Sequence, residues 1–595
     1  NITVNNGNTN NIYGGNNEGG LTSVSNISIN GGLHKNVFGG GLKVDTTTTN
    51  INANKGYITN LFGAGNEAGA TTTNINIGKS VIQNVFGSSN MSGDVDNIKN
   101  NSNVTITKWD MYITTSDSVL GADWSSATIT CDNSVYHITE QNKYYGTNTI
   151  GASSNFSFDF HVFSNVSYDE FTIKEVILIG YDESGNLYTT KAKVTNLYGG
   201  NNEGGTTNDA YILLTGGVVT NLYGGGNKAK TTNTNINIIN TLIENSFFGG
   251  GNEASVENVN ANVYSSTIGS TSNDAKMFGG GNKAKINDKI NFTISDNTQV
   301  YGSVFGGGNL GEVENTVTLT IKLNNVSAKT VYGGGNAALT NGNVDLIINN
   351  SNITDSIYGA GNGLDSIVPG DETGKDNPAK VNGNTNLTIT NTTANNVYGG
   401  GNLGFVNKST YVKLDSSTVT DSIYGGGNAA VVLNNTYLYV TNSKVLDSVY
   451  AGGNGVKAIV EGNTNLDIDN NSEITNHVFG GGNAAQTGTK EKNSSTGIVN
   501  IVGAIIGKNV YGGANTSVLY GETTVNIGSN VSLNNNLISS DIQIGGTVFG
   551  GGEANAAGSE IYDFSFISVT KGININIDAK NHQVFLINGS IFGSG

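Results

Sequence analysis

The stretch Leu222-Tyr223-Gly224-Gly225-Gly226-Asn227 is one copy of a motif that recurs along most of the 595-residue chain. The motif is an apolar residue, an aromatic residue, two or three small residues and an asparagine. The residue before the aromatic is apolar in all 18 copies, glycine follows it in 17, and asparagine lies four residues after it in 15 of the 17 copies that extend that far. The aromatic positions are Tyr13, Phe38, Phe62, Phe86, Tyr198, Tyr223, Phe248, Phe278, Phe305, Tyr332, Tyr358, Tyr398, Tyr424, Tyr450, Phe479, Tyr511, Phe549 and Phe592. A general excess of glycine would not keep this register, so the motif is a structural repeat.

The segments between the motifs alternate polar and apolar residues with a period of two. Examples are Thr-Asn-Ile-Asn-Ile at 73–77 and Asn-Thr-Asn-Ile-Asn-Ile at 233–238. A period of two with β-branched residues predicts β-strands. Most motifs are 24 to 30 residues apart, which suits one rung of a parallel β-helix. The sequence therefore predicts an all-β fold: a parallel β-solenoid of about 18 rungs with glycine-rich corners.

Stacking of the rungs explains why the motif has this composition. Successive rungs of a parallel sheet lie about 4.8 Å apart, so equivalent side chains form columns. Aromatic rings at that spacing are within the range that ring pairs favour, and stacked asparagines can pass amide hydrogen bonds from rung to rung. We therefore expect one aromatic ladder and one asparagine ladder. Glycine beside the ring permits a positive φ and a sharp corner, where any Cβ atom would clash.

Composition and charge exclude several functions. The net charge is −17, which disfavours nucleic-acid binding, and all 29 basic residues are lysine. Cys131 is the only cysteine, so no intrachain disulfide can form. No apolar run approaches the roughly 20 residues of a membrane span. Since the chain begins at Asn1 without methionine, it suits a processed or excised segment of a longer product.

Residues 91–194 lack the corner motif and divide the chain into solenoid rungs at 1–90, an insert at 91–194 and solenoid rungs at 195–595. Strand-forming runs and turn signals within this segment, such as Phe156–Phe163, predict a small β-sandwich. The block Tyr13–Gly20 begins again at Tyr198. The insert is therefore either a domain between two solenoid blocks or a bulge from one continuous solenoid, and we expect the bulge.

The chain resembles the extracellular β-solenoid surface proteins of bacteria, the group that includes repetitive adhesins and fibre-forming proteins. The resemblance covers residues 1–90 and 195–595 and is carried by the repeated Tyr/Phe-Gly-Gly-Gly-Asn corner. It implies an extracellular, often wall-attached product with a structural or adhesive role. The group shares no catalytic motif, so the resemblance implies no site residues.

The acidic residues of the chain are the candidates for a catalytic site or a calcium site. Asp467 and Asp469 are the nearest approach to a carboxylate pair, two residues apart on one strand face, where they are more simply a solvated surface. Asparagine replaces the aspartate that follows the glycines in calcium-binding rolls. The loop Asp365–Lys380, with Asp371, Glu372, Asp376, Pro369 and Pro378, is expected to be a surface excursion. We therefore predict no catalytic residue, no metal site and no cofactor.

The insert holds four further candidate side chains. His137 and His161 could ligate a metal if the fold brought them together, but they lack a paired spacing and are expected to be ordinary residues. Trp109 and Trp124 could stack on a sugar, although tryptophan in a small β-sandwich is more often in the core.

The sequence thus favours an extracellular structural protein, either a β-solenoid rod or the subunit of a head-to-tail surface fibre. The chain stops inside a corner motif at Phe592-Gly593-Ser594-Gly595. An uncapped rung exposes unpaired backbone, so another rung is expected to dock onto it, either from the remainder of a longer chain or from the next subunit of a filament. End-to-end self-association is the expected partnership. The alternative is a cell-surface adhesin or carbohydrate-binding module that recognises a glycan or a host surface, and a carbohydrate-active enzyme is the third possibility.

Overall fold

The computed structural model describes residues 1–91, 93–101, 193–314, 318–363, 378–528, 541–553, 569–580, 582 and 584–594, together with seven strands between residues 109 and 189. The fold is an all-β parallel β-solenoid of about 16 turns, against eighteen copies of the corner motif, and the described residues contain no helix. Contacts divide the chain into two compact units. Unit 1 comprises residues 1–222, 226–231 and 237–244, and unit 2 comprises residues 223–225, 232–236 and 245–595.

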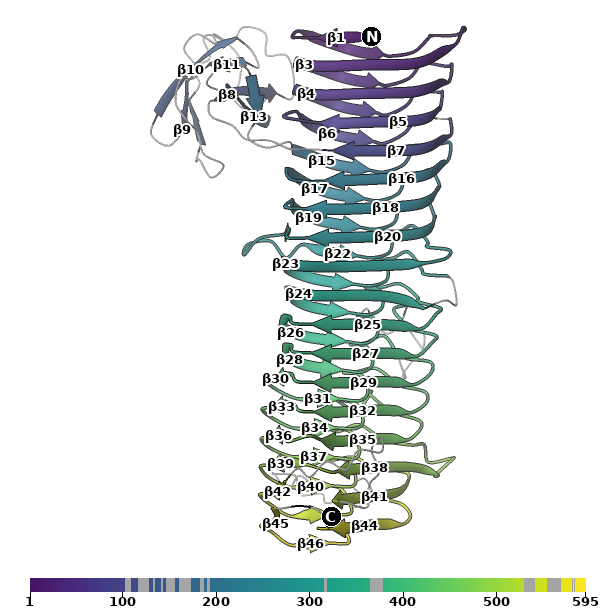
Figure 1. Ribbon diagram of the computed structural model, residues 1–595, viewed down its shortest axis with the longest axis vertical. Helices are drawn as coiled ribbons and strands as arrows, with labels where there is room; N and C mark the ends of the chain where they lie inside the picture. The colour runs from purple at the N-terminus through teal and green to yellow at the C-terminus, as the bar shows by residue number, and fades with distance from the viewer. Residues whose placement is uncertain are drawn as a thin grey trace, which may run out of the picture. The chain divides into compact units, whose positions relative to one another are not determined.

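The solenoid strands of unit 1 (Figure 1) are β1 (Ile2–Val4), β2 (Asn8–Tyr13), β3 (Thr22–Phe38), β4 (Thr46–Phe62), β5 (Ala70–Ile77), β6 (Val81–Phe86), β7 (Val95–Asn101), β15 (Lys193–Tyr198) and β16 (Thr207–Leu214). Residues of β17 (Val218–Tyr223), β18 (Thr231–Ile239) and β19 (Leu242–Phe248) belong partly to each unit. The pairing is parallel and displaced by one repeat, so that β3 pairs with β4 through Asn26↔Asn50 and Phe38↔Phe62. Equivalent residues of successive repeats therefore form the columns that the sequence predicts.

Unit 2 repeats this arrangement in a longer series. Its strands are β20 (Val256–Tyr264), β21 (Thr267–Ile268), β22 (Lys276–Phe278), β23 (Ile290–Phe305), β24 (Leu319–Tyr332), β25 (Val344–Asn349), β26 (Asn352–Tyr358), β27 (Thr385–Thr390), β28 (Thr393–Tyr398), β29 (Thr410–Asp415), β30 (Thr418–Val419), β31 (Ile423–Tyr424), β32 (Thr436–Thr441), β33 (Lys444–Val445), β34 (Val449–Tyr450), β35 (Thr464–Asp469), β36 (Ser472–Ile474), β37 (Val478–Phe479), β38 (Ser495–Ile501), β39 (Ala504–Ile506), β40 (Val510–Tyr511), β41 (Gly521–Gly528), β42 (Ile542–Ile544), β43 (Val548–Phe549), β44 (Ile573–Asp578), β45 (Phe585–Ile587) and β46 (Ile591–Phe592).

The insert forms a separate antiparallel sheet of seven strands in the order β12-β9-β10-β11-β8-β13-β14. Their bounds are β8 (Trp109–Thr115), β9 (Thr128–Cys131), β10 (Ser134–Glu140), β11 (Lys143–Tyr145), β12 (Phe156–Asp159), β13 (Ile173–Tyr181) and β14 (Leu187–Thr189). The described residues between 109 and 189 form this one sheet, so the β-sandwich stays a prediction.

The solenoid of unit 1 is continuous across the insert. β6 pairs in parallel with β15, and the register places Phe86 opposite Tyr198. β7 pairs with β5 on one side and β16 on the other, and so belongs to the solenoid sheet. The insert is therefore a bulge from one solenoid, as expected.

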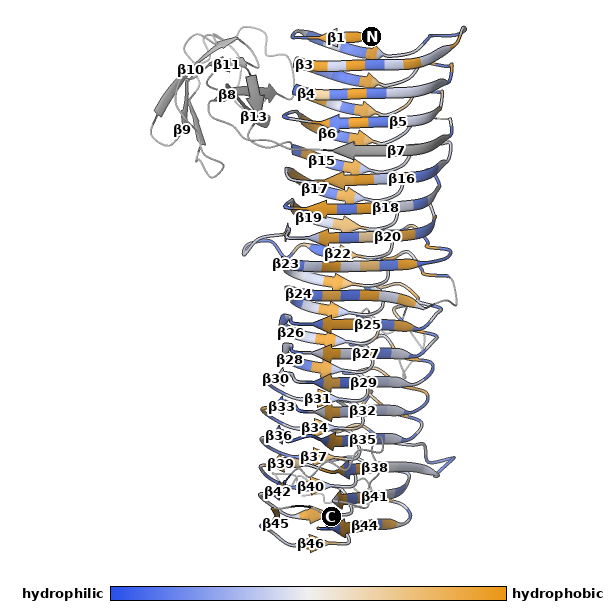
Figure 2. Ribbon diagram, viewed as in Figure 1, coloured by the Kyte–Doolittle hydropathy of each residue, from blue (hydrophilic) through white to orange (hydrophobic). Residues whose placement is uncertain are grey.

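Apolar and polar residues alternate along many of the solenoid strands, as the hydropathy colouring of Figure 2 shows, and the buried positions are mostly the apolar ones. In unit 1, Ile27, Ile51 and Ile75 occupy one column through the register of β3, β4 and β5, and all three are fully buried. Burying one such side chain contributes about 1.5–3 kcal/mol. Each rung adds one buried side chain to the column, so the buried apolar area grows with the number of rungs and not within one central core.

A column of buried threonines is a feature that the sequence analysis missed. Thr385, Thr410 and Thr436 begin successive strands and are fully buried. Their hydroxyls donate to the carbonyl oxygens of the corner residues Gly399, Gly425 and Ala451 at 2.7, 2.6 and 2.6 Å, respectively. Each hydrogen bond fastens the start of a strand to the glycine-rich corner and satisfies a buried polar group.

The glycine-rich corner agrees with one part of its prediction and differs in the other. None of the described glycines that directly follow a ladder aromatic has a φ in the left-handed range, so no positive φ is used there. The predicted clash of a Cβ atom is confirmed, and its cause is the close approach between rungs. A methyl group on Gly39 would lie 2.1 Å from the carbonyl oxygen of Gly63, and one on Gly63 would lie 2.0 Å from that of Gly87. Glycine is needed here because the next backbone occupies the space of a Cβ atom.

One core column of unit 1 contains a histidine. His34 is 1% exposed and lies in register with Ile58, which lies in register with Ile82. Its Nε2 donates to the carbonyl oxygen of Gly31 at 2.8 Å, and its Nδ1 accepts from the hydroxyl of Thr9 at 2.8 Å. Burial lowers the pKa of His34, so the folded protein holds the ring neutral.

Unit 1 should consequently lose stability in mild acid. Below the ordinary histidine pKa of about 6.5 the unfolded chain binds a proton that the folded chain does not, so the free energy of unfolding falls as the pH falls. We expect His34→Ile, which restores the residue type of its column, to flatten this part of the pH profile. Thermal unfolding measured between pH 7 and pH 5 would check this, and an unchanged slope in the variant would contradict it.

Candidate functional site

The aromatic residues of unit 1 form a continuous stack. Neighbouring ring centroids from Tyr13 through Phe38, Phe62 and Phe86 to Tyr198 are 4.7, 4.7, 5.0 and 5.0 Å apart, with interplanar angles of 4° to 7°. The rings cover one another's faces, which leaves the three phenylalanines only 3% to 5% exposed. The predicted aromatic ladder is confirmed, and only the edges of its rings can face outward.

Two asparagine ladders flank this stack, although the sequence analysis predicted one. The predicted ladder lies four residues after each ring: Asn90 donates to Asn66 at 2.8 Å, and Asn202 donates to Asn90 at 2.9 Å. The second ladder lies two residues before each ring. Its four bonds, each between 2.8 and 3.0 Å, join Asn11, Asn36, Asn60, Asn84 and Asn196 in order.

These three columns enclose an open groove in unit 1, which we call the corner groove. The ring edges form its floor, one asparagine ladder forms each wall, and its volume is about 430 Å³. The lining residues are Asn11, Tyr13, Asn36, Phe38, Asn60, Phe62, Asn66, Asn84, Phe86, Asn90, Tyr198, Asn202 and Asn227. The volume lies within the range of sites that bind small molecules.

Unit 2 has the same aromatic ladder with a different chemistry. Its rings stack from Tyr223 to Phe592, and the distances from Phe248 to Phe549 are 4.7 to 4.9 Å. Seven of its thirteen rings are tyrosines, and the hydroxyls of some of them hydrogen-bond to both flanking columns. Tyr424 bonds to Ser422 and Asn483, and Tyr450 bonds to Ser448 and Asn515. At these rungs the hydroxyls occupy the space that the phenylalanines of unit 1 leave open.

These tyrosines make the stability of unit 2 sensitive to alkali. Burial raises the pKa of Tyr450 and of Tyr511 to about 12. Above pH 10 the unfolded tyrosines lose protons that the folded ones keep, so the free energy of unfolding falls as the pH rises from 10 to 12. We expect phenolate absorbance and the loss of β-sheet circular dichroism to rise together in this window. Phenolate formation by Tyr450 and Tyr511 near pH 10 with the fold intact, measured as the difference from the double variant Tyr450→Phe and Tyr511→Phe, would contradict this expectation.

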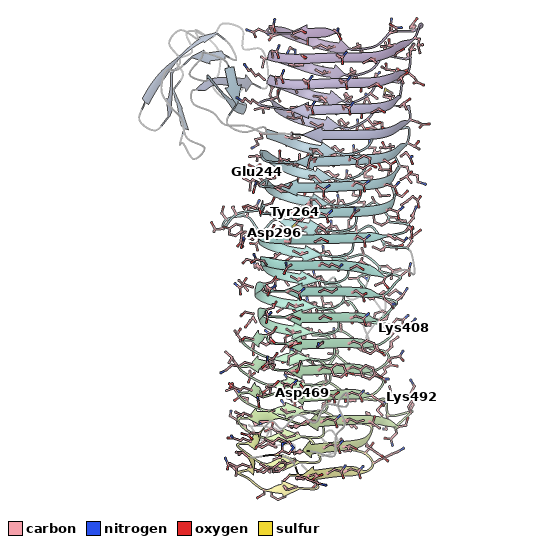
Figure 3. The ribbon with its side chains drawn as sticks, in the orientation of Figure 1. Glu244, Tyr264, Asp296, Lys408, Asp469 and Lys492 are labelled. Atoms are coloured by element: carbon pink, nitrogen blue, oxygen red, sulfur yellow. The ribbon has the colours of Figure 1, made fainter. Side chains whose placement is uncertain are left out.

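The predicted carboxylate pair lies on the outward positions of β35, where Asp469 is labelled in Figure 3. Asp467 accepts a hydrogen bond from Asn500 at 2.6 Å, and both aspartates are only partly exposed. Burial raises the pKa of both carboxyl groups, and the charge of Asp415 raises that of Asp469 further. The strand face is therefore less solvated than the sequence analysis expected.

Several other sequence candidates lie outside the described residues. These are Trp124, His161 and the part of the acidic loop that contains Pro369, Asp371, Glu372 and Asp376. Trp109, Cys131 and His137 lie on β8, β9 and β10 of the insert sheet, of which only the backbone is described. Within the described residues, no group of three or more His, Cys, Asp or Glu side chains could hold a metal ion.

The described residues contain no helix that is long and apolar enough to cross a membrane. Comparison of the chain with protein-family models, with curated proteins and with solved structures finds no match.

Proposed function

We propose that this chain is an extracellular structural protein, a β-solenoid rod or the subunit of a head-to-tail surface fibre. The observation that carries the proposal is the continuity of the ladders inside each unit. In unit 2, ring stacks connect all corner aromatics from Tyr223 to Phe592. Hydrogen bonds between side-chain amides connect the asparagines from Asn252 to Asn515. The extracellular location rests on the resemblance of the corner motif to bacterial surface proteins.

Ladders of this kind suit a mechanical role because every added rung brings the same set of contacts. A stacked ring pair contributes about 0.5–1.5 kcal/mol beyond its buried area, and an amide hydrogen bond contributes about 0.5–1.5 kcal/mol. Neighbouring rungs are also joined by a parallel backbone ladder along each strand. Bending or sliding one rung would break all of these contacts together, so the array resists deformation.

End-to-end association is part of the proposal. On the rung formed by β44, β45 and β46, Leu586, Ile591 and Phe592 are 44%, 52% and 50% exposed. Val548, which pairs with Ile591 in the same column, is fully buried. Another rung, from a second copy or from further residues of a longer chain, would cover these side chains with the contacts that the rest of the solenoid uses, and the proposal takes the second copy.

Negative-stain electron microscopy of a dilution series tests the proposal. We expect filaments longer than a single chain that survive dilution. Phe592→Asp should shorten or abolish them, because a carboxylate would enter the apolar stack. Val456→Asp, at a residue that is 76% exposed, is the matched control and should leave them unchanged. Isolated particles of one chain at every concentration would overturn the fibre.

A further inference from the structure

We propose that the corner groove of unit 1 binds an uncharged glycan, with the sugar chain lying along the stacking direction of the rungs. This binding activity goes beyond the structural role proposed above and does not depend on it. Three observations carry it: the hydrogen-bonding capacity of the groove walls, the missing hydroxyls on its floor and its repeat distance.

The walls can donate and accept hydrogen bonds along the groove: the second ladder lines it from Asn11 to Asn84, and the predicted ladder lines it from Asn66 to Asn227. A side-chain amide has two N–H donors and an oxygen that accepts twice. Within the second ladder, Asn60 uses one N–H to bond to Asn36 at 2.9 Å and its oxygen to accept from Asn84 at 2.9 Å. This leaves one donor and one acceptor site for each such amide. Sugar hydroxyls, which also donate and accept, match this pattern on both walls.

The floor of the groove carries no hydroxyl over three consecutive rungs. Phe38, Phe62 and Phe86 lie there between Tyr13 and Tyr198. Unit 2 also has three consecutive phenylalanines, Phe248, Phe278 and Phe305, but serine or lysine takes the place of the second-ladder asparagine two residues before each of them. The unit 1 groove therefore combines apolar ring edges with two amide walls. That combination suits a sugar, which has C–H edges and equatorial hydroxyls.

The groove repeats at the spacing of its ladders, 4.7 to 5.0 Å between ring centroids. An extended chain of linked pyranose rings advances by a similar step for each sugar, so one sugar can face one rung. None of the lining residues carries a charge. The groove therefore favours a neutral chain over a uronic acid polymer, because a buried carboxylate would find no cationic partner.

Isothermal titration of the full chain with neutral hexasaccharides tests the proposal. The probes are cellohexaose, mannohexaose, laminarihexaose and chitohexaose, with hexagalacturonate as the charged counterpart. We expect at least one neutral probe to bind, with an affinity that salt does not change and that falls at least about tenfold for the corresponding trisaccharide. Failure of all four neutral probes, or preference for hexagalacturonate, would overturn the proposal.

The groove can be filled without disturbing the fold, because tyrosine already occupies other places in the same ladder. The triple variant Phe38→Tyr, Phe62→Tyr and Phe86→Tyr places three hydroxyls on the floor and should weaken binding at least about tenfold. The matched control carries the same change at Phe278, Phe305 and Phe479 of unit 2 and should bind as the native chain does. Equal affinity of both variants would place the glycan elsewhere and overturn the assignment, whether or not the chain forms filaments.

Discussion

Replacing Phe305 by alanine is expected to lower the free energy of unfolding of unit 2 by about 3–5 kcal/mol. Phe305 is 2% exposed, and its ring stacks on Phe278 at 4.8 Å and on Tyr332 at 4.7 Å. Truncation removes both ring contacts and leaves a cavity in the middle of the column. The rungs on either side cannot move together to fill it, because parallel hydrogen bonds fix their spacing.

Denaturant unfolding followed by circular dichroism would measure this loss. Tyr411→Ala is the matched control, because this ring also stacks on a neighbour, Tyr437 at 4.7 Å, but lies outside the ladder and is 37% exposed. We expect the control to cost no more than about 1 kcal/mol. If both variants lost the same free energy of unfolding, stacking in the ladder would contribute no more to stability than an ordinary surface contact. Since each rung contacts only its neighbours, the Phe305 variant could also unfold in two separate steps.

The columns of the solenoid could be predicted from the sequence because each column consists of residues at the same position in successive repeats. Tyr223 and Asn227 recur at fixed positions relative to the corner, and stacking at the strand spacing converts that recurrence into ladders. The strands followed in the same way from residues such as Ile75 and Ile77. Where the repeat is strictly periodic, the position of a residue within the repeat is enough to predict which side chains of the neighbouring rungs it contacts.

Features that depend on one residue within a column could not be predicted in this way. His34 gives no periodic signal, and only its register with Ile58 shows that it lies in the core. The corner groove depends on phenylalanine in place of tyrosine at Phe38, Phe62 and Phe86, a difference that the motif treats as equivalent. The second ladder had a visible signal, asparagine two residues before the ring, but that signal is confined to part of the chain.

Glycine at the corner was predicted correctly, and one of the two reasons given for it is confirmed. The sequence predicts both a positive φ and a clash with any Cβ atom, and the structure shows the clash alone, as a contact between rungs. The distinction matters for mutagenesis. A positive φ would penalise every side chain by a similar strain, but a close approach penalises side chains according to their size and to how far the neighbouring rung can move.

Replacing Gly359 by valine is therefore expected to destabilise unit 2 by more than about 4 kcal/mol. A Cβ at this position would lie 2.2 Å from the carbonyl oxygen of Gly399 on the next rung and 3.2 Å from Cβ of Thr385. The carbonyl oxygen belongs to the backbone and accepts the hydroxyl of Thr385, so moving it would also break that hydrogen bond. Gly359→Ala should cost about 1–3 kcal/mol, because the chain itself accommodates a methyl group at the equivalent Ala451.

Gly572→Val provides the matched control for this series. Gly572 is exposed, and the nearest atom to its added Cβ is a side-chain carbon of Glu522 at 3.5 Å, an ordinary contact. We expect the control to change the free energy of unfolding by no more than about 0.5 kcal/mol. A larger loss of free energy of unfolding for valine than for alanine at Gly359, with little loss for valine at Gly572, would identify contact between rungs as the constraint. Equal costs for alanine and valine at Gly359 would instead indicate backbone strain, and would contradict the geometry of the corner.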